Sequence, residues 1–122
     1  MKKRHAKIVV KTIENAKREW KEALEGKRKG IQKDDEIVFT SLEAVARVFS
    51  KGRMEILRTI IQEKPKSIYE LAKLLERDFK NVHTDVKLLA DIGLLDLKEA
   101  GDSRNGLIPL AKFSGIDLDW AA

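Results

Sequence analysis

The 122-residue sequence contains no cysteine, and this absence excludes several kinds of protein at once. Disulfide-stabilised folds, zinc sites with cysteine ligands and enzymes with a thiolate nucleophile all need a residue that the chain lacks. Its two histidines, His5 and His83, are too few for a histidine-rich metal site. We therefore expect no metal ion and no cofactor.

Long apolar runs are missing as well. No stretch approaches the roughly 20 apolar residues that a membrane-spanning helix needs. The first four residues are mostly basic, but only Ile8-Val9-Val10 follows as an apolar run, which is too short for a signal peptide. Hydrophobic residues still make up 43% of the chain, enough to bury a core. These features predict a soluble cytoplasmic protein that does not contact a membrane.

Acidic residues are scarce in the N-terminal third of the chain. Residues 1–33 carry a net charge of +8, whereas residues 34–122 carry −3. Within the second part, residues 47–87 carry +4 between two acidic flanks. A basic middle is compatible with a nucleic-acid-binding face. It is equally compatible with the solvated faces of a highly charged protein.

Local patterns divide the chain into an extension, residues 1–33, and a main domain, residues 34–122. The extension contains a predicted strand at 6–11, a helix that begins at Thr12 and ends near Gly26, and a basic linker. The main domain begins with a strand at 36–40. One helix is then predicted to begin at Ser41, with Ala44, Val45 and Val48 inward. Another is predicted to follow Ser50-Lys51-Gly52, with Met54, Leu57, Ile60 and Ile61 inward.

The segment 67–95 is the most informative part of the sequence. Ser67 and Glu70 form a capping box, which predicts a helix with Ile68, Leu71, Ala72 and Leu75 inward. After a short turn Asp78 caps a second helix, on which Phe79, Val82, Val86, Leu89 and Gly93 form one apolar face.

The opposite face of that second helix is polar, with Lys80, Thr84 and Lys87 outward and Asn81 and His83 at its sides. Two helices joined by a short turn are typical of a helix-turn-helix when the second helix has a polar outer face. The major groove admits one helix, whose polar side chains face the DNA while its apolar side chains pack on the protein. A generic helix pair would show the same periodicity.

A hairpin is predicted directly after this helix. Residues 94–99 alternate like an edge strand, Asn105-Gly106 is a strong turn signal, and residues 107–110 return. A hairpin in this position is the wing of a winged helix-turn-helix. Arg104 at its tip would reach a phosphate or the minor groove, unless the hairpin only packs.

At these residues the sequence resembles the winged helix-turn-helix transcriptional regulators of the MarR/ArsR-like superfamily, in particular a prokaryotic set of short predicted regulators. The resemblance covers residues 36–112 and rests on the runs IVFTSLEAVARVFSKGRMEILRTI, SIYELAKLL and RDFKNVHTDVKLLADIGLL, with Ile108-Pro109 and the acidic tail 116–119. It implies a mainly α fold with a small β wing. It also implies sequence-specific binding of double-stranded DNA by a homodimer, with a recognition helix at about 78–92 and a wing at about 94–111. Where relatives commonly have Ser-Arg, this chain has His83-Thr84, so a guanine-reading arginine is absent.

The candidate site follows from these two lines of inference. The predicted DNA-binding residues are Arg77, Lys80, Asn81, His83, Thr84, Lys87, Arg104 and Asn105. Ile13, Trp20 and Leu24 on the N-terminal helix are predicted to form the dimer, the alternative being that this helix folds back on its own domain. No catalytic constellation can be named, so we expect no enzyme. The alternative function is a protein-interaction module or an antitoxin-like partner of another protein.

Overall fold

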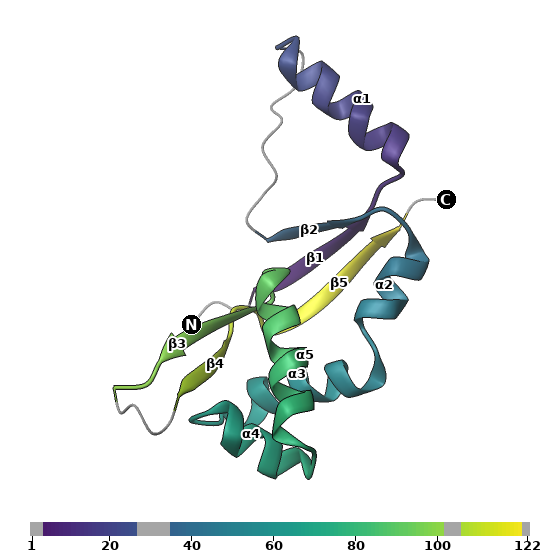
Figure 1. Ribbon diagram of the computed structural model, residues 1–122. Helices are drawn as coiled ribbons and strands as arrows, with labels where there is room; N and C mark the ends of the chain where they lie inside the picture. The colour runs from purple at the N-terminus through teal and green to yellow at the C-terminus, as the bar shows by residue number, and fades with distance from the viewer. Residues whose placement is uncertain (1–3, 27–34, 102–105, 121–122) are drawn as a thin grey trace.

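A computed structural model of the chain describes residues 4–26, 35–101 and 106–120, which form a mixed α/β domain of five helices and five strands (Figure 1). The chain contains more β structure than the expected mainly α fold. Besides the expected hairpin, the N-terminal, middle and C-terminal segments contribute strands to a second sheet.

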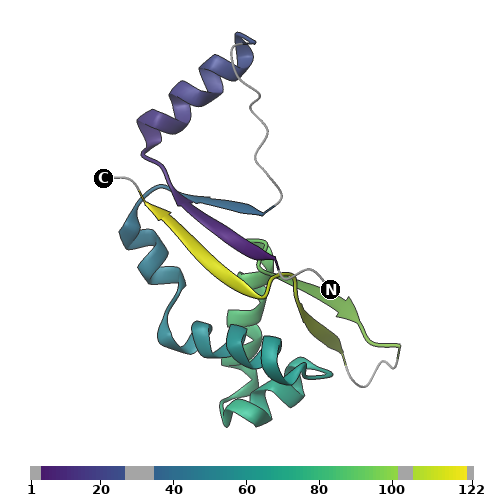
Figure 2. The same ribbon diagram turned by 180° about the vertical axis from the view of Figure 1, so that it is seen from behind.

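This second sheet has three strands in the order β2-β1-β5. The central strand β1 (His5–Val10) pairs in parallel with β2 (Glu36–Phe39) on one side and with β5 (Gly115–Trp120) on the other (Figure 2). Because successive side chains in a strand point to opposite faces, Ala6 and Ile8 share one face and are buried, at 0% and 1% exposure. The strands predicted at 6–11 and 36–40 are thereby confirmed.

Strand β5 was not predicted. In the sequence its residues Ile116-Asp117-Leu118-Asp119 read as an acidic tail. The alternation of apolar and acidic residues is that of a strand with one face toward the protein and one toward solvent. Its acidic side chains contact β1: His5 Nδ1 lies 3.1 Å from Asp117 Oδ1, and Lys7 Nζ lies 3.6 Å from Asp119 Oδ2.

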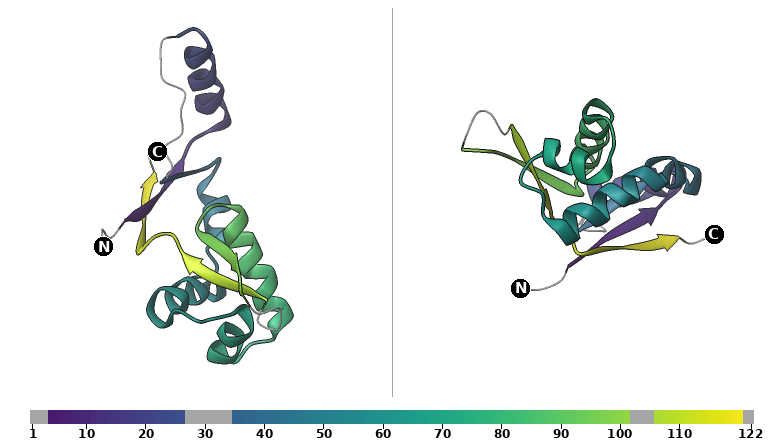
Figure 3. Two further views of the ribbon diagram at one scale, coloured as in Figure 1. Left: turned by 90° about the vertical axis from the view of Figure 1, so that its left-hand side faces the viewer. Right: turned by 90° about the horizontal axis from the view of Figure 1, so that it is seen from below.

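Helix α1 (Ile13–Leu24) connects β1 to β2 and projects away from the other helices (Figure 1; Figure 3). Its start is the predicted one, because the Thr12 hydroxyl oxygen accepts a hydrogen bond from the Asn15 backbone N–H at 3.1 Å.

The remaining four helices lie on the opposite side of the sheet from α1 (Figure 3). Three of them begin at the predicted cap residues Ser41, Ser67 and Asp78, and each cap accepts a hydrogen bond from the backbone N–H three residues later. The helix predicted to follow Ser50-Lys51-Gly52 begins earlier, because Ser50 itself is the cap and accepts from the Arg53 N–H. They are α2 (Leu42–Val48), α3 (Lys51–Glu63), α4 (Ile68–Leu75) and α5 (Phe79–Asp91).

The hydrophobic core lies where α3, α4 and α5 meet. On α3 the buried side chains are Ile56, Leu57 and Ile60, whereas Met54, predicted to face inward, is 42% exposed. The inner stripe of α3 is therefore turned slightly from the predicted one: Ile56 faces inward in place of Met54, because α3 packs against α4, α5 and β4 together. The inward residues of α4 and α5 are largely as predicted, except that Phe79 is 44% exposed.

Strands β3 (Leu95–Glu99) and β4 (Leu107–Ala111) follow α5 and form an antiparallel pair with Leu97 opposite Pro109. The pair extends away from the three-stranded sheet (Figure 3). Pro109 is buried, and β4 contacts α3 and α4. The predicted tip residues Arg104 and Asn105 lie outside the described residues.

Candidate functional site

The pair α4–α5 combines a tight turn with an outward polar helix. Helix α4 ends at Glu76, which takes the left-handed conformation (φ 54°), and α5 begins two residues later at Asp78. A non-glycine residue in this conformation costs about 1 kcal/mol, and here its N–H is used, because it bonds to the carbonyl oxygens at the end of α4. The turn fixes the angle at which α5 leaves α4.

The inner face of α5 is completely buried. Val82, Val86 and Leu89 are each 0% exposed and pack in the core beside Ile56 of α3 and Leu71 of α4. Their spacing of four and three residues is the one predicted. A helix anchored so firmly on one side presents its other side in a fixed orientation.

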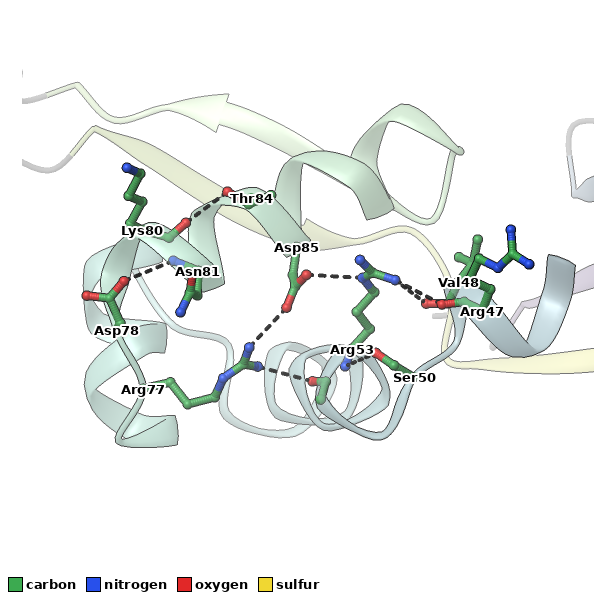
Figure 4. Close-up of polar contacts among 11 residues, drawn as sticks. Arg47, Val48, Ser50, Arg53, Arg77, Asp78, Lys80, Asn81, Thr84 and Asp85 are labelled. Atoms are coloured by element: carbon green, nitrogen blue, oxygen red, sulfur yellow. Dashed lines mark hydrogen bonds and ion pairs between the residues drawn. The ribbon is translucent and has the colours of Figure 1, made fainter. Parts of the chain in front are cut away.

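The outer face of α5 is polar and exposed. Lys80, Asn81, Thr84 and Lys87 all have exposed side chains, as predicted. The Thr84 hydroxyl donates a hydrogen bond to the carbonyl oxygen of Lys80 at 3.0 Å, and the backbone N–H of Asn81 donates to the Asp78 carboxylate at 3.2 Å (Figure 4). The side-chain amide of Asn81 has no hydrogen-bond partner among the described residues and projects toward solvent.

One acidic residue of α5 points toward the protein instead. The Asp85 carboxylate lies between two guanidinium groups: Arg53 Nε donates to one oxygen at 3.1 Å and Arg77 Nη2 donates to the other at 3.0 Å (Figure 4). These three side chains, which we call the Arg–Asp–Arg clamp, are only 17–30% exposed. The clamp joins α5 to the start of α3 and to the turn before α5.

Both arginines also bind backbone carbonyl oxygens. Arg53 Nη1 donates at 3.1 Å to the carbonyl oxygens of Arg47 and Val48, which end α2. Arg77 Nη1 lies 3.5 Å from the carbonyl oxygen of Gly52, where an added Cβ would come within 3.3 Å of the same nitrogen. A glycine at position 52 therefore gives the Arg77 guanidinium room.

Sequence reasoning missed the clamp. Arg77 was predicted to contact DNA, and in the structure its guanidinium is bound to Asp85. Arg53 and Asp85 were not singled out at all. The available signal was an acidic residue between Lys80 and Lys87 in the predicted recognition helix. Its partner Arg53 lies 32 residues away, and nothing local connects them.

An aromatic row runs along the corner between α4 and α5. The ring centroids of Tyr69 and Phe79 are 6.1 Å apart, and those of Phe79 and His83 are 5.6 Å apart. Lys73 Nζ lies 4.7 Å from the Tyr69 ring centroid. His83 is thus partly buried against Phe79, whereas Tyr69 and Phe79 remain 57% and 44% exposed.

Helix α1 leaves its apolar side chains uncovered. Ile13 is 59% exposed, Trp20 is 70% exposed and Leu24 is 90% exposed. These are the three residues predicted to form a dimer. Within one chain they are not buried against the domain.

Neither a metal site nor a membrane-spanning helix is found in the part of the chain that the structure describes. Among residues 4–26, 35–101 and 106–120, no three His, Cys, Asp or Glu side chains are arranged to hold a metal ion. In the same residues, no helix is long and apolar enough to cross a membrane.

Comparison with known proteins gives one match. The model of a family described as HVO_A0114 matches residues 48–118, which is more than half of the chain and includes α3, α4, α5 and the β3–β4 hairpin. No curated protein and no solved structure matches the chain.

Proposed function

The chain belongs to the HVO_A0114 family, and from the geometry of α4 and α5 we propose that it is a transcriptional regulator that binds double-stranded DNA. In this proposal the domain is a winged helix-turn-helix. Helix α5 enters the major groove, and the β3–β4 hairpin is the wing, which lies along the DNA backbone or the minor groove.

The observation that carries the proposal is the division of α5 into two faces. Its inner side chains Val82, Val86 and Leu89 are 0% exposed, while Lys80, Asn81, Thr84 and Lys87 are exposed on the other side. A major groove about 12 Å wide accepts a single helix, whose polar side chains then reach the base edges. Lysine donates to guanine and phosphate oxygens, and asparagine pairs with adenine.

The Arg–Asp–Arg clamp supports the same proposal. Reading base edges requires a helix that keeps its rotation and tilt, because hydrogen bonds weaken steeply with distance and angle. Asp85 joins α5 to α3 and to the turn at Arg77 through two charged hydrogen bonds. In this proposal Arg53 and Arg77 position the recognition helix, and its exposed residues make the contacts.

We propose that the DNA-binding form is a homodimer. Helix α1 is amphipathic, and its apolar side chains Ile13, Trp20 and Leu24 are uncovered in the single chain. A second copy would cover them with the same surface, as two-fold symmetry requires. Two recognition helices would then read two half-sites.

A titration of duplex DNA tests the proposal. A labelled duplex from the region upstream of the protein's own gene, and a scrambled duplex of equal composition, are titrated at two salt concentrations. We expect the native duplex to bind at least about 10³-fold more tightly. Thr84→Ala should cost about 1–3 kcal/mol on the native duplex, and Lys87→Ala should also reduce the salt dependence by about one counterion if Lys87 binds phosphate.

Arg58→Ala is the matched control, because Arg58 is an exposed cation of α3 that lines a cavity next to β5 and not the α5 surface. It should leave both affinities unchanged. Equal binding of the two duplexes would limit the protein to backbone binding or place its operator elsewhere. No binding at low salt would refute the proposal.

A second candidate function rests on the aromatic row. Exposed aromatic side chains such as Tyr69 and Phe79 are enriched at protein interfaces, and Leu74 of α4 is also 50% exposed. A winged-helix module that binds another protein would use this corner. This candidate is favoured if the wild-type chain binds no duplex. It predicts that Phe79→Ser weakens binding of the partner protein and that Lys80→Ala does not.

A further inference from the structure

A cavity of about 620 Å³ opens between the end of α3, the turn that leads to α4, and strand β4 with the link that follows it. A second cavity of about 290 Å³ lies beside it and shares the wall formed by Ile61, Ala111, Phe113 and Ser114. Small-molecule sites in proteins have volumes of about 300–1,000 Å³. The larger cavity has the size of a site for one small molecule.

The floor of the larger cavity is apolar. Ile60 is 2% exposed and Phe113 is 7% exposed, and buried Pro109 lies with them among the lining residues. The apolar surface still accessible in the cavity belongs to Ile61, Ile108 and Leu110, of which Leu110 is 42% exposed. An apolar group placed here would leave water and cover these three side chains, which favours binding.

The rim of the cavity carries positive charge. Arg4, Lys64, Lys66 and Lys112 are among its lining residues, and no Asp or Glu is. Within the described part of the chain, none of these four cations forms an ion pair with a carboxylate. An anion at the rim would therefore face only cations.

Two of the rim cations are held in place by the fold. The carbonyl oxygen of Arg4 accepts hydrogen bonds from the Ser114 N–H at 2.8 Å and from the Ser114 hydroxyl at 3.1 Å. The guanidinium carbon of Arg4 lies 5.1 Å from the Phe113 ring centroid. Lys64 is the left-handed cap of α3 (φ 48°), and the next residue, Pro65, is buried. The Arg4 guanidinium and the backbone of Lys64 are therefore positioned before an anion binds.

We propose that this cavity binds a small amphipathic acid, with its apolar body on the floor and its carboxylate at the cationic rim formed by Arg4, Lys64, Lys66 and Lys112. A DNA duplex is a poor occupant of this cavity, because its polar surface has no apolar group to cover the apolar floor. A purely inorganic anion would use the rim alone, and each exposed cation pairs with it only weakly.

A ligand in this cavity would also change DNA affinity, and this part of the inference rests on the proposed function. The cavity walls belong to α3, to the turn before α4 and to β4, so an occupant contacts both the helices and the hairpin. If the hairpin contacts DNA, a ligand that favours one hairpin position changes DNA affinity by its differential affinity for the two states. The acid then acts as an effector.

The binding step is tested without DNA. Octanoate, 1-octanol and octylammonium are titrated into the ¹⁵N-labelled full chain, and amide shifts are followed. We expect octanoate to saturate and to shift residues 64–66 and 108–113, with at least tenfold tighter binding than 1-octanol. Octylammonium should not bind measurably.

Variants at exposed rim positions keep the test interpretable, because replacing an exposed lysine seldom changes folding. Lys66→Ala with Lys112→Ala should weaken octanoate binding about tenfold, which corresponds to about 1.4 kcal/mol. Lys98→Ala, an exposed lysine of β3 outside the cavity, should leave it unchanged. Charge reversal, Lys66→Glu with Lys112→Glu, should make octylammonium the tighter ligand.

Equal binding of octanoate and 1-octanol would overturn the proposal, and so would equal effects of the rim pair and Lys98→Ala. The DNA titration is separate, so the two proposals can fail independently. If octanoate binds as expected but no duplex binds, the site stands and its effector role falls.

Discussion

At the scale of single residues, the role of Asp85 follows from its two arginine partners. Its carboxylate lies between two guanidinium groups and offsets the repulsion between Arg53 of α3 and Arg77 in the turn before α5. The three side chains are only partly accessible to water, so the solvent screens them less than it screens an exposed ion pair.

We expect Asp85→Asn to lower the free energy of unfolding by about 1–3 kcal/mol, because two charged hydrogen bonds are weakened and the two arginines lose their counter-charge. Urea unfolding followed by circular dichroism measures the change. Asp91→Asn, which removes an exposed carboxylate of the same helix, is the control and should change stability by less than about 0.5 kcal/mol. Equal losses in the two variants would show that the clamp contributes nothing.

The clamp also separates stability from DNA binding. If it orients α5, Asp85→Asn should weaken binding to the native duplex even at temperatures where the variant is fully folded. Thr84→Ala should weaken binding with little change in stability, since Thr84 is exposed. A variant Asp85→Asn that is less stable but binds normally would restrict Asp85 to a folding role.

At the scale of elements, the helices and the strands β1 and β2 could be predicted from the sequence, whereas strand β5 and the pairing of the three strands could not. Helix starts depend on cap residues such as Ser67 and Asp78, which act on backbone groups three residues away. The pairing of β1 with β5 joins residues about 110 positions apart, and a parallel pair leaves no turn signal in the sequence. The apolar stripe of α5 was predictable because its residues are three or four positions apart. The clamp was not, because Arg53 and Asp85 are 32 positions apart.

The central strand provides a prediction at this scale. Ile8 of β1 is 1% exposed, so Ile8→Ala should cost about 2–4 kcal/mol of unfolding free energy through lost burial and a residual cavity. Val38→Ala on the neighbouring strand, where Val38 is 38% exposed, should cost less than about 1 kcal/mol. Urea unfolding compares the two variants.

The outcome bears on the predicted division of the chain at residue 33. If Ile8→Ala unfolds the whole chain in one transition at lower urea, β1 is part of a single cooperative unit with the helices. If the helical signal is unchanged while only the sheet residues lose hydrogen-exchange protection, the extension is a separate unit.

At the scale of the whole molecule, the helices α2–α5 lie at one end, the three-stranded sheet in the middle and α1 at the other end (Figure 1). Helix α1 is therefore far from the surface of α5 that we propose for DNA. A dimer formed through α1 would leave both DNA-binding surfaces free.

We expect the wild-type chain to sediment as a dimer and Trp20→Ser to weaken dimerisation at least about 100-fold, because each dimer loses two large apolar side chains worth about 2 kcal/mol apiece. Trp120→Ser is the matched control, since Trp120 is 53% exposed at the end of the edge strand β5. If Trp120→Ser and not Trp20→Ser produces monomers, the sheet edge is the interface. A wild-type monomer at concentrations that saturate DNA would contradict the dimer.

The parallel pairing of β1 with β5 has a consequence for the order of folding. His5 pairs with Gly115, so the sheet closes a loop of about 110 residues, and contacts of such long range form slowly and late. During synthesis β1 emerges first, yet one of its two edges stays open until residues 115–120 have left the ribosome. Over that interval Ile8-Val9-Val10 is an apolar edge with free backbone groups, which is the kind of segment that pairs with other chains. The basic residues around it, Lys7 and Lys11 among them, place like charges on every nascent copy and oppose that pairing until its own C-terminal strand arrives.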